Sequence, residues 1–75
     1  MLVKEALSLS DDKKKLEEVL THSLEVEEDL MRTYLITADN IHEDLELKNR
    51  LENFAEGNAK RTDQLINELK ELKGE

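Results

Sequence analysis

The chain of 75 residues has no cysteine and no proline, and it contains only two glycines and two aromatic residues. Without cysteine the chain can form neither a disulfide framework nor a thiolate metal site. Without proline and with little glycine, few positions interrupt a helix, and the abundance of Leu, Glu and Lys is typical of long helices. These absences predict an all-α protein.

Long apolar runs are also missing, because charged residues interrupt the first seven positions and no apolar stretch follows. We therefore expect neither a secretion signal nor a membrane span, and a cytoplasmic protein is the default. The formal net charge is −8, with 40% charged residues. A surface with this excess of negative charge would repel nucleic acid and anionic membranes. Neither is therefore an expected partner.

A first helix is predicted over about residues 10–38, and residues 1–9 are expected to form a flexible arm or one extra helical turn. Ser10 is suited to cap the helix, and Asp11 and Asp12 place negative charge at its amino end. From there, apolar residues recur at three- and four-residue steps, as one face of a helix requires. They are Leu16, Val19, Leu20, Leu24, Leu30, Met31, Tyr34, Leu35 and Ala38.

A second helix is predicted over about residues 43–73, after a turn at Asp39 and Asn40, two short polar residues that tolerate left-handed backbone angles. Gly74 would end this helix after Lys70 and Lys73. Its apolar stripe is Leu47, Leu51, Phe54, Ala55, Leu65, Ile66, Leu69 and Leu72.

Two such helices joined by a short loop form one domain, a long antiparallel hairpin. In a single hairpin each helix contacts only one other helix, along one line of contact that we call the seam. The broad apolar stripes would therefore stay partly exposed. A chain of this size is also too small to be comfortably stable alone. We therefore expect two hairpins to form a homodimeric four-helix bundle.

Polar residues interrupt both stripes at one level. Glu27 falls near the middle of the first stripe, and Asn58 and Thr62 fill the gap in the second, with Arg61 at its edge. The sequence predicts an interior polar layer in which Arg61 pairs with Glu27, directly or across the dimer, while Asn58 and Thr62 satisfy the remaining hydrogen bonds. The alternative is a solvated rim, in which the charged groups reach water along their stems.

The two aromatic residues, Tyr34 and Phe54, sit on the two stripes near the turn and are expected to form a core pair. His22 lies on the polar side of the first helix and His42 lies near the turn. Each histidine has only incidental carboxylates one helical turn away, and a solvated role is the stronger interpretation.

The pattern over residues 16–70 resembles half of a ferritin-like, rubrerythrin-type bundle. In that family one helix supplies an inward Glu followed seven residues later by an aromatic, and the next helix supplies Glu-x-x-His; two hairpins then enclose a di-iron site. Here Glu27 precedes Tyr34 by that interval, and residues 54–61 resemble the second segment. Asn58, however, stands at the motif's Glu position and Arg61 at its His position.

These two replacements argue against a metal, because Asn is a poor anionic ligand and a guanidinium has no lone pair to offer. The favoured function is therefore a non-enzymatic, self-associating bundle without a cofactor, serving structure or the binding of another protein helix. The alternative is a ferritin-like protein that binds iron or another divalent metal and acts as a di-iron oxidoreductase. Its ligands would be Glu27 and Glu56, with His22 or His42. The simple composition also suits a designed bundle, although the irregular polar positions weigh against that origin.

Overall fold

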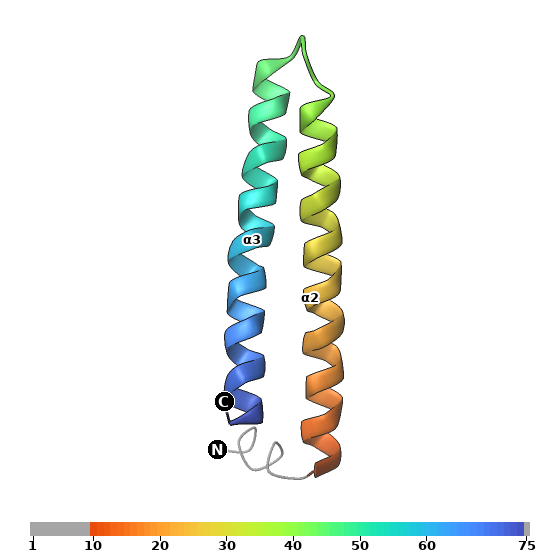
Figure 1. Ribbon diagram of the computed structural model, residues 1–75, viewed down its shortest axis with the longest axis vertical. Helices are drawn as coiled ribbons and strands as arrows, with labels where there is room; N and C mark the ends of the chain where they lie inside the picture. The colour runs from red at the N-terminus through yellow and green to blue at the C-terminus, as the bar shows by residue number, and fades with distance from the viewer. Residues whose placement is uncertain (1–9, 75) are drawn as a thin grey trace.

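The computed structural model describes residues 10–74, which form two long helices packed against each other in antiparallel directions (Figure 1). Helix α2 runs over Ser10–Asp39 and helix α3 over Leu45–Lys73. The predicted all-α hairpin is confirmed. The arm expected over residues 1–9 lies outside the described residues. Neither α2 nor α3 is apolar enough over a sufficient length to cross a membrane.

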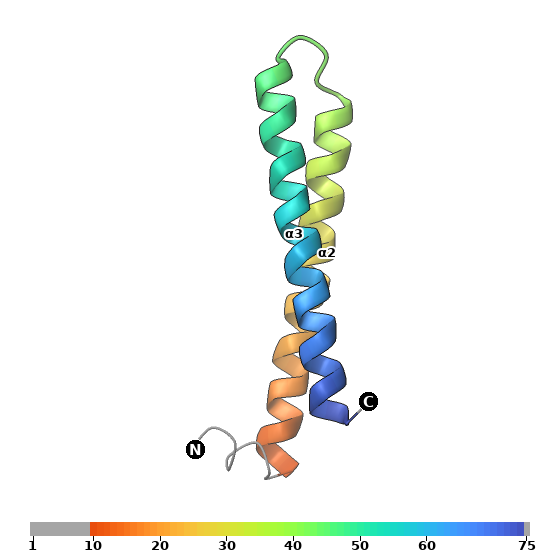
Figure 2. The same cartoon turned by 90° about the vertical axis from the view of Figure 1, so that its left-hand side faces the viewer.

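The hairpin is a narrow rod of 53 × 20 × 18 Å. The turn occupies one end, and the start of α2 meets the end of α3 at the other. Seen from the side, the two helices cross near the middle of the rod (Figure 2). Glu27 and Arg61 each lie near the middle of their helix in the sequence.

The turn is built differently from the sequence-based expectation. Asp39 is still helical, and α2 closes with backbone bonds from Asn40 N to Thr37 O and from Ile41 N to Ala38 O, each 3.1 Å long. No non-glycine residue in the described part of the chain has a positive φ. The left-handed conformation that Asp39 and Asn40 tolerate is therefore not used there.

Both ends of α3 are capped by side-chain or backbone groups. Asp44 accepts a hydrogen bond from the backbone N–H of Leu47 at 3.0 Å, which satisfies one of the free donors of the first turn. At the other end Gly74 has φ 77° and donates its N–H to Lys70 and Glu71. This left-handed conformation suits glycine because it has no Cβ. Helix α2 starts at Ser10, whose side chain lies outside the described set.

The seam between the helices follows alternating steps of four and three residues, the spacing of an antiparallel coiled coil. In α2 the seam residues are Leu20, Leu24, Glu27, Met31, Tyr34 and Ala38. In α3 they are Leu51, Ala55, Asn58, Thr62, Leu65, Leu69 and Leu72. All of them are buried or half-buried, so each helix turns one narrow stripe toward the other.

This seam covers only part of the apolar surface. Ala38 and Ala55 are the buried hydrophobic residues of the described chain, at 1% and 3% exposure. Larger apolar side chains remain 40% to 68% exposed, namely Val19, Val26, Leu30, Leu35, Ile36, Leu45 and Phe54. The hairpin therefore leaves outside much of what a bundle core would bury.

The cap at Asp44 yields the first prediction. Asp44→Ala removes the acceptor for the Leu47 N–H and should lower the free energy of unfolding by about 1 kcal/mol. Urea unfolding followed by circular dichroism at one fixed protein concentration measures the change. Asp44→Asn is the matched control, because Asn caps helices about as well as Asp. Equal losses in the two variants would contradict a capping role.

Candidate functional site

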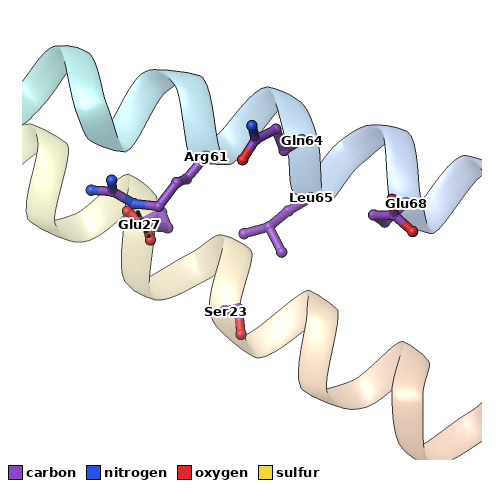
Figure 3. A pocket seen from close by; sticks show the side chains of 6 residues that line it. All are labelled: Ser23, Glu27, Arg61, Gln64, Leu65 and Glu68. Carbon is purple, nitrogen blue, oxygen red and sulfur yellow. Dashed lines mark hydrogen bonds and ion pairs between the residues drawn. The ribbon is translucent and has the colours of Figure 1, made fainter.

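The most distinctive site of the hairpin is the carboxylate of Glu27 in the seam of α2, which receives two donors from α3. Asn58 Nδ2 donates to Glu27 Oε1 at 2.6 Å, and Arg61 Nε donates to Glu27 Oε2 at 2.9 Å. Figure 3 shows the arginine reaching from α3 to the glutamate on α2. The two oxygens of one carboxylate therefore bind two different turns of the opposite helix.

Asn58 supplies the interior half of this site. Its side chain is 2% exposed, and the Glu27 side chain is 19% exposed. An amide donating to an ionised carboxylate makes a charge-assisted bond, which is stronger than a bond between neutral groups. The seam thus holds Glu27 in its ionised form.

Arg61 supplies the outer half. Its side chain is 53% exposed, and only its Nε contacts the carboxylate. The rest of the guanidinium lies over Gly57, where an added Cβ would stand 3.3 Å from Nη1 and 3.4 Å from Nη2. The structure combines the two interpretations of the polar layer, with an interior bond to Asn58 and a rim bond to Arg61.

The same contacts explain the acidity of Glu27. The hydrogen bond from Asn58, followed by that from Arg61, lowers the pKa of Glu27 below its ordinary value of 4.5. Loss of hydration opposes this effect, and the positive charge of Arg61 adds to it. Glu27 is therefore ionised throughout the physiological pH range and does not act as a proton donor there.

Thr62 does not play the part expected of it. Its hydroxyl oxygen is buried and has no hydrogen-bond partner among the described residues, and the same holds for Asn58 Oδ1. The prediction that Thr62 completes the hydrogen bonds of the polar layer is wrong. The Thr62 hydroxyl does not reach the Glu27 carboxylate, whose two oxygens are bonded by Asn58 and Arg61.

Tyr34 and Phe54 do meet, but at the edge of the seam. Their ring centroids are 5.5 Å apart, with the planes tilted by 50°. Phe54 is 54% exposed in the single hairpin, so the pair lies at the edge of the α2–α3 seam and not inside it. Phe54 lies one position before the buried Ala55, and its ring consequently leans out from the seam.

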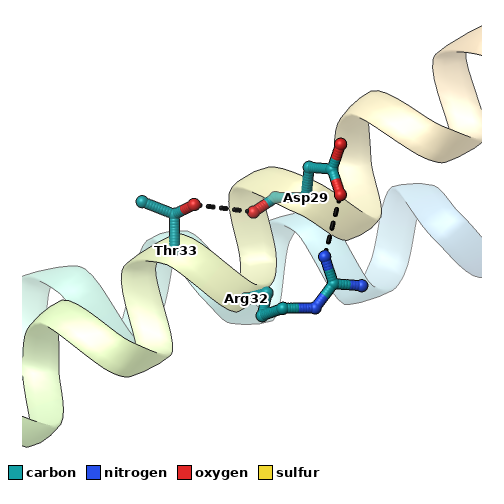
Figure 4. A network of polar contacts seen from close by, with 3 residues as sticks. All are labelled: Asp29, Arg32 and Thr33. Carbon is teal, nitrogen blue, oxygen red and sulfur yellow. Dashed lines mark hydrogen bonds and ion pairs between the residues drawn. The ribbon is translucent and has the colours of Figure 1, made fainter.

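Other charged groups of α2 form contacts on the outer surface. Arg32 Nη1 donates to Asp29 Oδ1 at 2.8 Å, and Thr33 Oγ1 donates to the backbone oxygen of Asp29 at 2.9 Å (Figure 4). The Arg32 and Asp29 side chains are 64% and 75% exposed. An ion pair so exposed contributes little to stability.

The residues of the alternative metal site do not converge in the hairpin. His22, His42 and Glu56 are exposed, and His42 lies in the turn. Within residues 10–74, no group of three or more His, Asp or Glu side chains is placed to hold a metal ion. Glu27, the inward carboxylate, is instead occupied by donors of the chain itself.

Two shallow grooves flank the ion pair on one face of the hairpin. The groove toward the open end is lined by Ser23, Glu27, Arg61, Gln64, Leu65 and Glu68 (Figure 3). The groove toward the turn includes Leu30, Tyr34, Phe54 and Gly57. Sequence reasoning singled out Arg61 but not these grooves, because it did not establish which edge of α3 faces which edge of α2.

Comparison with protein-family models, with curated proteins and with solved structures gives no match to this chain.

The lowered pKa of Glu27 predicts how stability depends on pH. A carboxyl group whose pKa is lower in the folded state stabilises the fold above its unfolded pKa, and this stabilisation is lost as pH falls through the folded pKa. Between pH 6 and pH 3 the unmodified chain should therefore lose more unfolding free energy than Glu27→Gln. Urea unfolding at several pH values makes the comparison. Parallel pH curves would exclude a contribution from Glu27 ionisation.

Substitutions in the polar layer test how its members depend on one another. Arg61→Ala leaves the Glu27 carboxylate without its cation and should destabilise the hairpin. Replacing Glu27, Asn58 and Arg61 together by Leu removes every polar group of the layer and should cost much less, or stabilise the fold. The double change Glu27→Leu with Arg61→Leu should lie between, because the buried Asn58 amide loses its acceptor. Thermal unfolding ranks the variants, and a triple variant less stable than Arg61→Ala would contradict this account.

Proposed function

We propose that this chain is a non-enzymatic helical hairpin that associates with a second copy into a four-helix bundle and serves as a structural or protein-interaction module. The observation that carries the proposal is the apolar surface outside the seam. Val19 and Phe54 are 59% and 54% exposed, whereas the buried hydrophobic residues among those that the structure describes are two alanines. Burial of such side chains is the main favourable term in association.

The polar layer supports assembly more than catalysis. Glu27 is bound by two donors of its own chain, and its lowered pKa removes it from acid–base chemistry near neutral pH. Polar groups inside helical bundles can fix register and pairing at little net gain in stability. In this proposal Glu27, Asn58 and Arg61 align α2 with α3, so that the outer apolar residues form one reproducible surface.

The ferritin-like alternative rests on the position of Glu27. It is a carboxylate turned into the seam, seven residues before the seam residue Tyr34, as the resemblance requires. Metal would have to displace Arg61 and recruit ligands from a second hairpin. Metal analysis of protein purified without a metal-binding tag tests this alternative. The variant Asn58→Glu with Arg61→His, which restores the family motif, is the positive control.

Self-association predicts a definite mass. Size-exclusion chromatography with light scattering should give twice the chain mass of 8.7 kDa at micromolar concentration, with a shift toward the monomer on dilution. The helical circular dichroism signal should weaken as the dimer dissociates, because a lone hairpin buries little apolar surface. A monomer that stays fully helical and stable at every concentration would refute the proposal.

A further inference from the structure

The two faces of the hairpin differ sharply in charge. One edge of each helix lies beside the ion pair, and together these edges form what we call the Arg61 face. On α2 this edge carries Val19, Ser23, Val26, Leu30, Thr33 and Thr37, none of which is charged. On α3 it carries Arg50, Phe54, Gly57, Arg61, Gln64 and Glu68.

The opposite edges form an acidic face. On α2 they carry Thr21, Glu25, Glu28, Arg32, Leu35 and Asp39, and on α3 Glu52, Glu56, Ala59, Asp63, Ile66 and Lys70. Six of these side chains are acidic and two are basic. Two copies of a chain with net charge −8 repel each other most across such a face. The Arg61 face, where Glu27 neutralises Arg61, avoids this cost.

The spacing on the Arg61 face is symmetric. On both edges the residues follow steps of four, three, four, three and four, which read the same in either direction. Over residues 19–37 the α2 series is centred at residue 28, and over residues 50–68 the α3 series is centred at residue 59. Because Glu27 bonds to both Asn58 and Arg61, these two centres lie at nearly the same level of the rod. A single twofold axis can therefore serve both helices.

From this geometry we propose that a second copy of the chain docks on the Arg61 face with its turn at the opposite end, about a twofold axis at the level of the Glu27–Arg61 pair. This inference rests on the proposed self-association and specifies its face and orientation. Each helix then meets its own counterpart, running in the opposite direction. Such an isologous contact closes at two chains.

The side chains brought together by this axis are complementary. Arg50 of one copy lies against Glu68 of the other, and Phe54 lies against Gln64, beside the groove that contains Ser23 and Leu65. Near the axis Val26 meets Leu30 of the second copy. These contacts cover apolar groups that are 40% to 54% exposed in the single hairpin.

Gly57 and Arg61 lie opposite each other across the axis. In each copy the guanidinium of Arg61 lies over Gly57 of its own chain and is already paired with its own Glu27. The axis thus brings together two ion pairs and no free cation. With both turns at the same end, α3 would face α2 instead. Glu68 would then lie against Val19 and Arg50 against Thr37, with no opposite charge for either.

Charge reversal at the two ends of the α3 series tests the proposal. In the dimer of Arg50→Glu, the new glutamate of each copy lies against Glu68 of the other, so two acidic residues meet at both ends. In the dimer of Glu68→Arg, the new arginine of each copy lies against Arg50 of the other, so two basic residues meet instead. Each variant alone should dimerise about tenfold more weakly. For Glu68→Arg this holds although the net charge becomes less negative, which by itself would favour association. An equimolar mixture restores both opposite-charge contacts and should form a heterodimer, detected by native mass spectrometry.

Arg32→Glu and Glu56→Arg are the matched controls, because they change the net charge equally on the acidic face. They should show neither the paired weakening nor preferential heterodimer formation. Circular dichroism checks that all four variants fold. If Glu68→Arg tightens the dimer and mixing selects no heterodimer, this face and orientation are wrong while self-association stands. A natural chain that is monomeric at every concentration overturns the proposed function as well.

The absence of cysteine permits a second, independent test. Arg50→Cys and Glu68→Cys in one chain place the two thiols about 27 Å apart along α3, too far for an internal disulfide. In the proposed dimer each thiol faces its counterpart on the second copy. Mild oxidation should then give a closed covalent dimer on a non-reducing gel. Uncrosslinked chain or a ladder of larger species would overturn the orientation.

Discussion

The hairpin depends on one constraint, namely that an ionised carboxylate in an otherwise largely apolar seam needs donors. Asn58 and Arg61 provide them from two successive turns of α3. Sliding α3 by one heptad would place Leu51 or Leu65 opposite Glu27 and leave the carboxylate without a partner. The apolar residues alone would not exclude such a slip, because leucines recur along both helices. The contacts of the polar layer therefore favour this alignment over one shifted by a heptad.

This alignment of the two helices leaves less apolar surface buried between them. Polar residues occupy the middle of the seam, the fully buried apolar residues are the small Ala38 and Ala55, and several larger apolar groups lie exposed on the edges. Stability and specificity are thus supplied by different parts of the molecule. The seam fixes how α2 and α3 pair, whereas the edges hold the hydrophobic surface that a further contact can bury. A chain with a continuous leucine seam would be more stable alone and less well defined in register.

Much of the fold follows directly from the sequence. The turn residues Asp39 and Asn40 and the terminal Gly74 marked where the two helices end, and the polar positions that interrupt both stripes predicted the pairing of Glu27 with Arg61. The exposure of Phe54 did not follow, because a shift of one position on the helical wheel separates the edge from the core. The sequence also did not show that the Thr62 hydroxyl lacks a partner, since this depends on the distance between two side chains on different helices. Both features depend on how far each helix is rotated about its own axis. That rotation is set when the two helices pack together and cannot be read from either helix alone.

The guanidinium of Arg61 lies over Gly57 and therefore limits which residues position 57 can accept. A methyl group at position 57 would require the guanidinium tip to move by a few tenths of an ångström, and a branched side chain would collide with it. Positions 57 and 61 should therefore change together in related chains, with a bulky residue at the first accompanied by a short one at the second. The glycine at position 57 is thus explained by the arginine one helical turn later, at position 61, whose guanidinium needs the space.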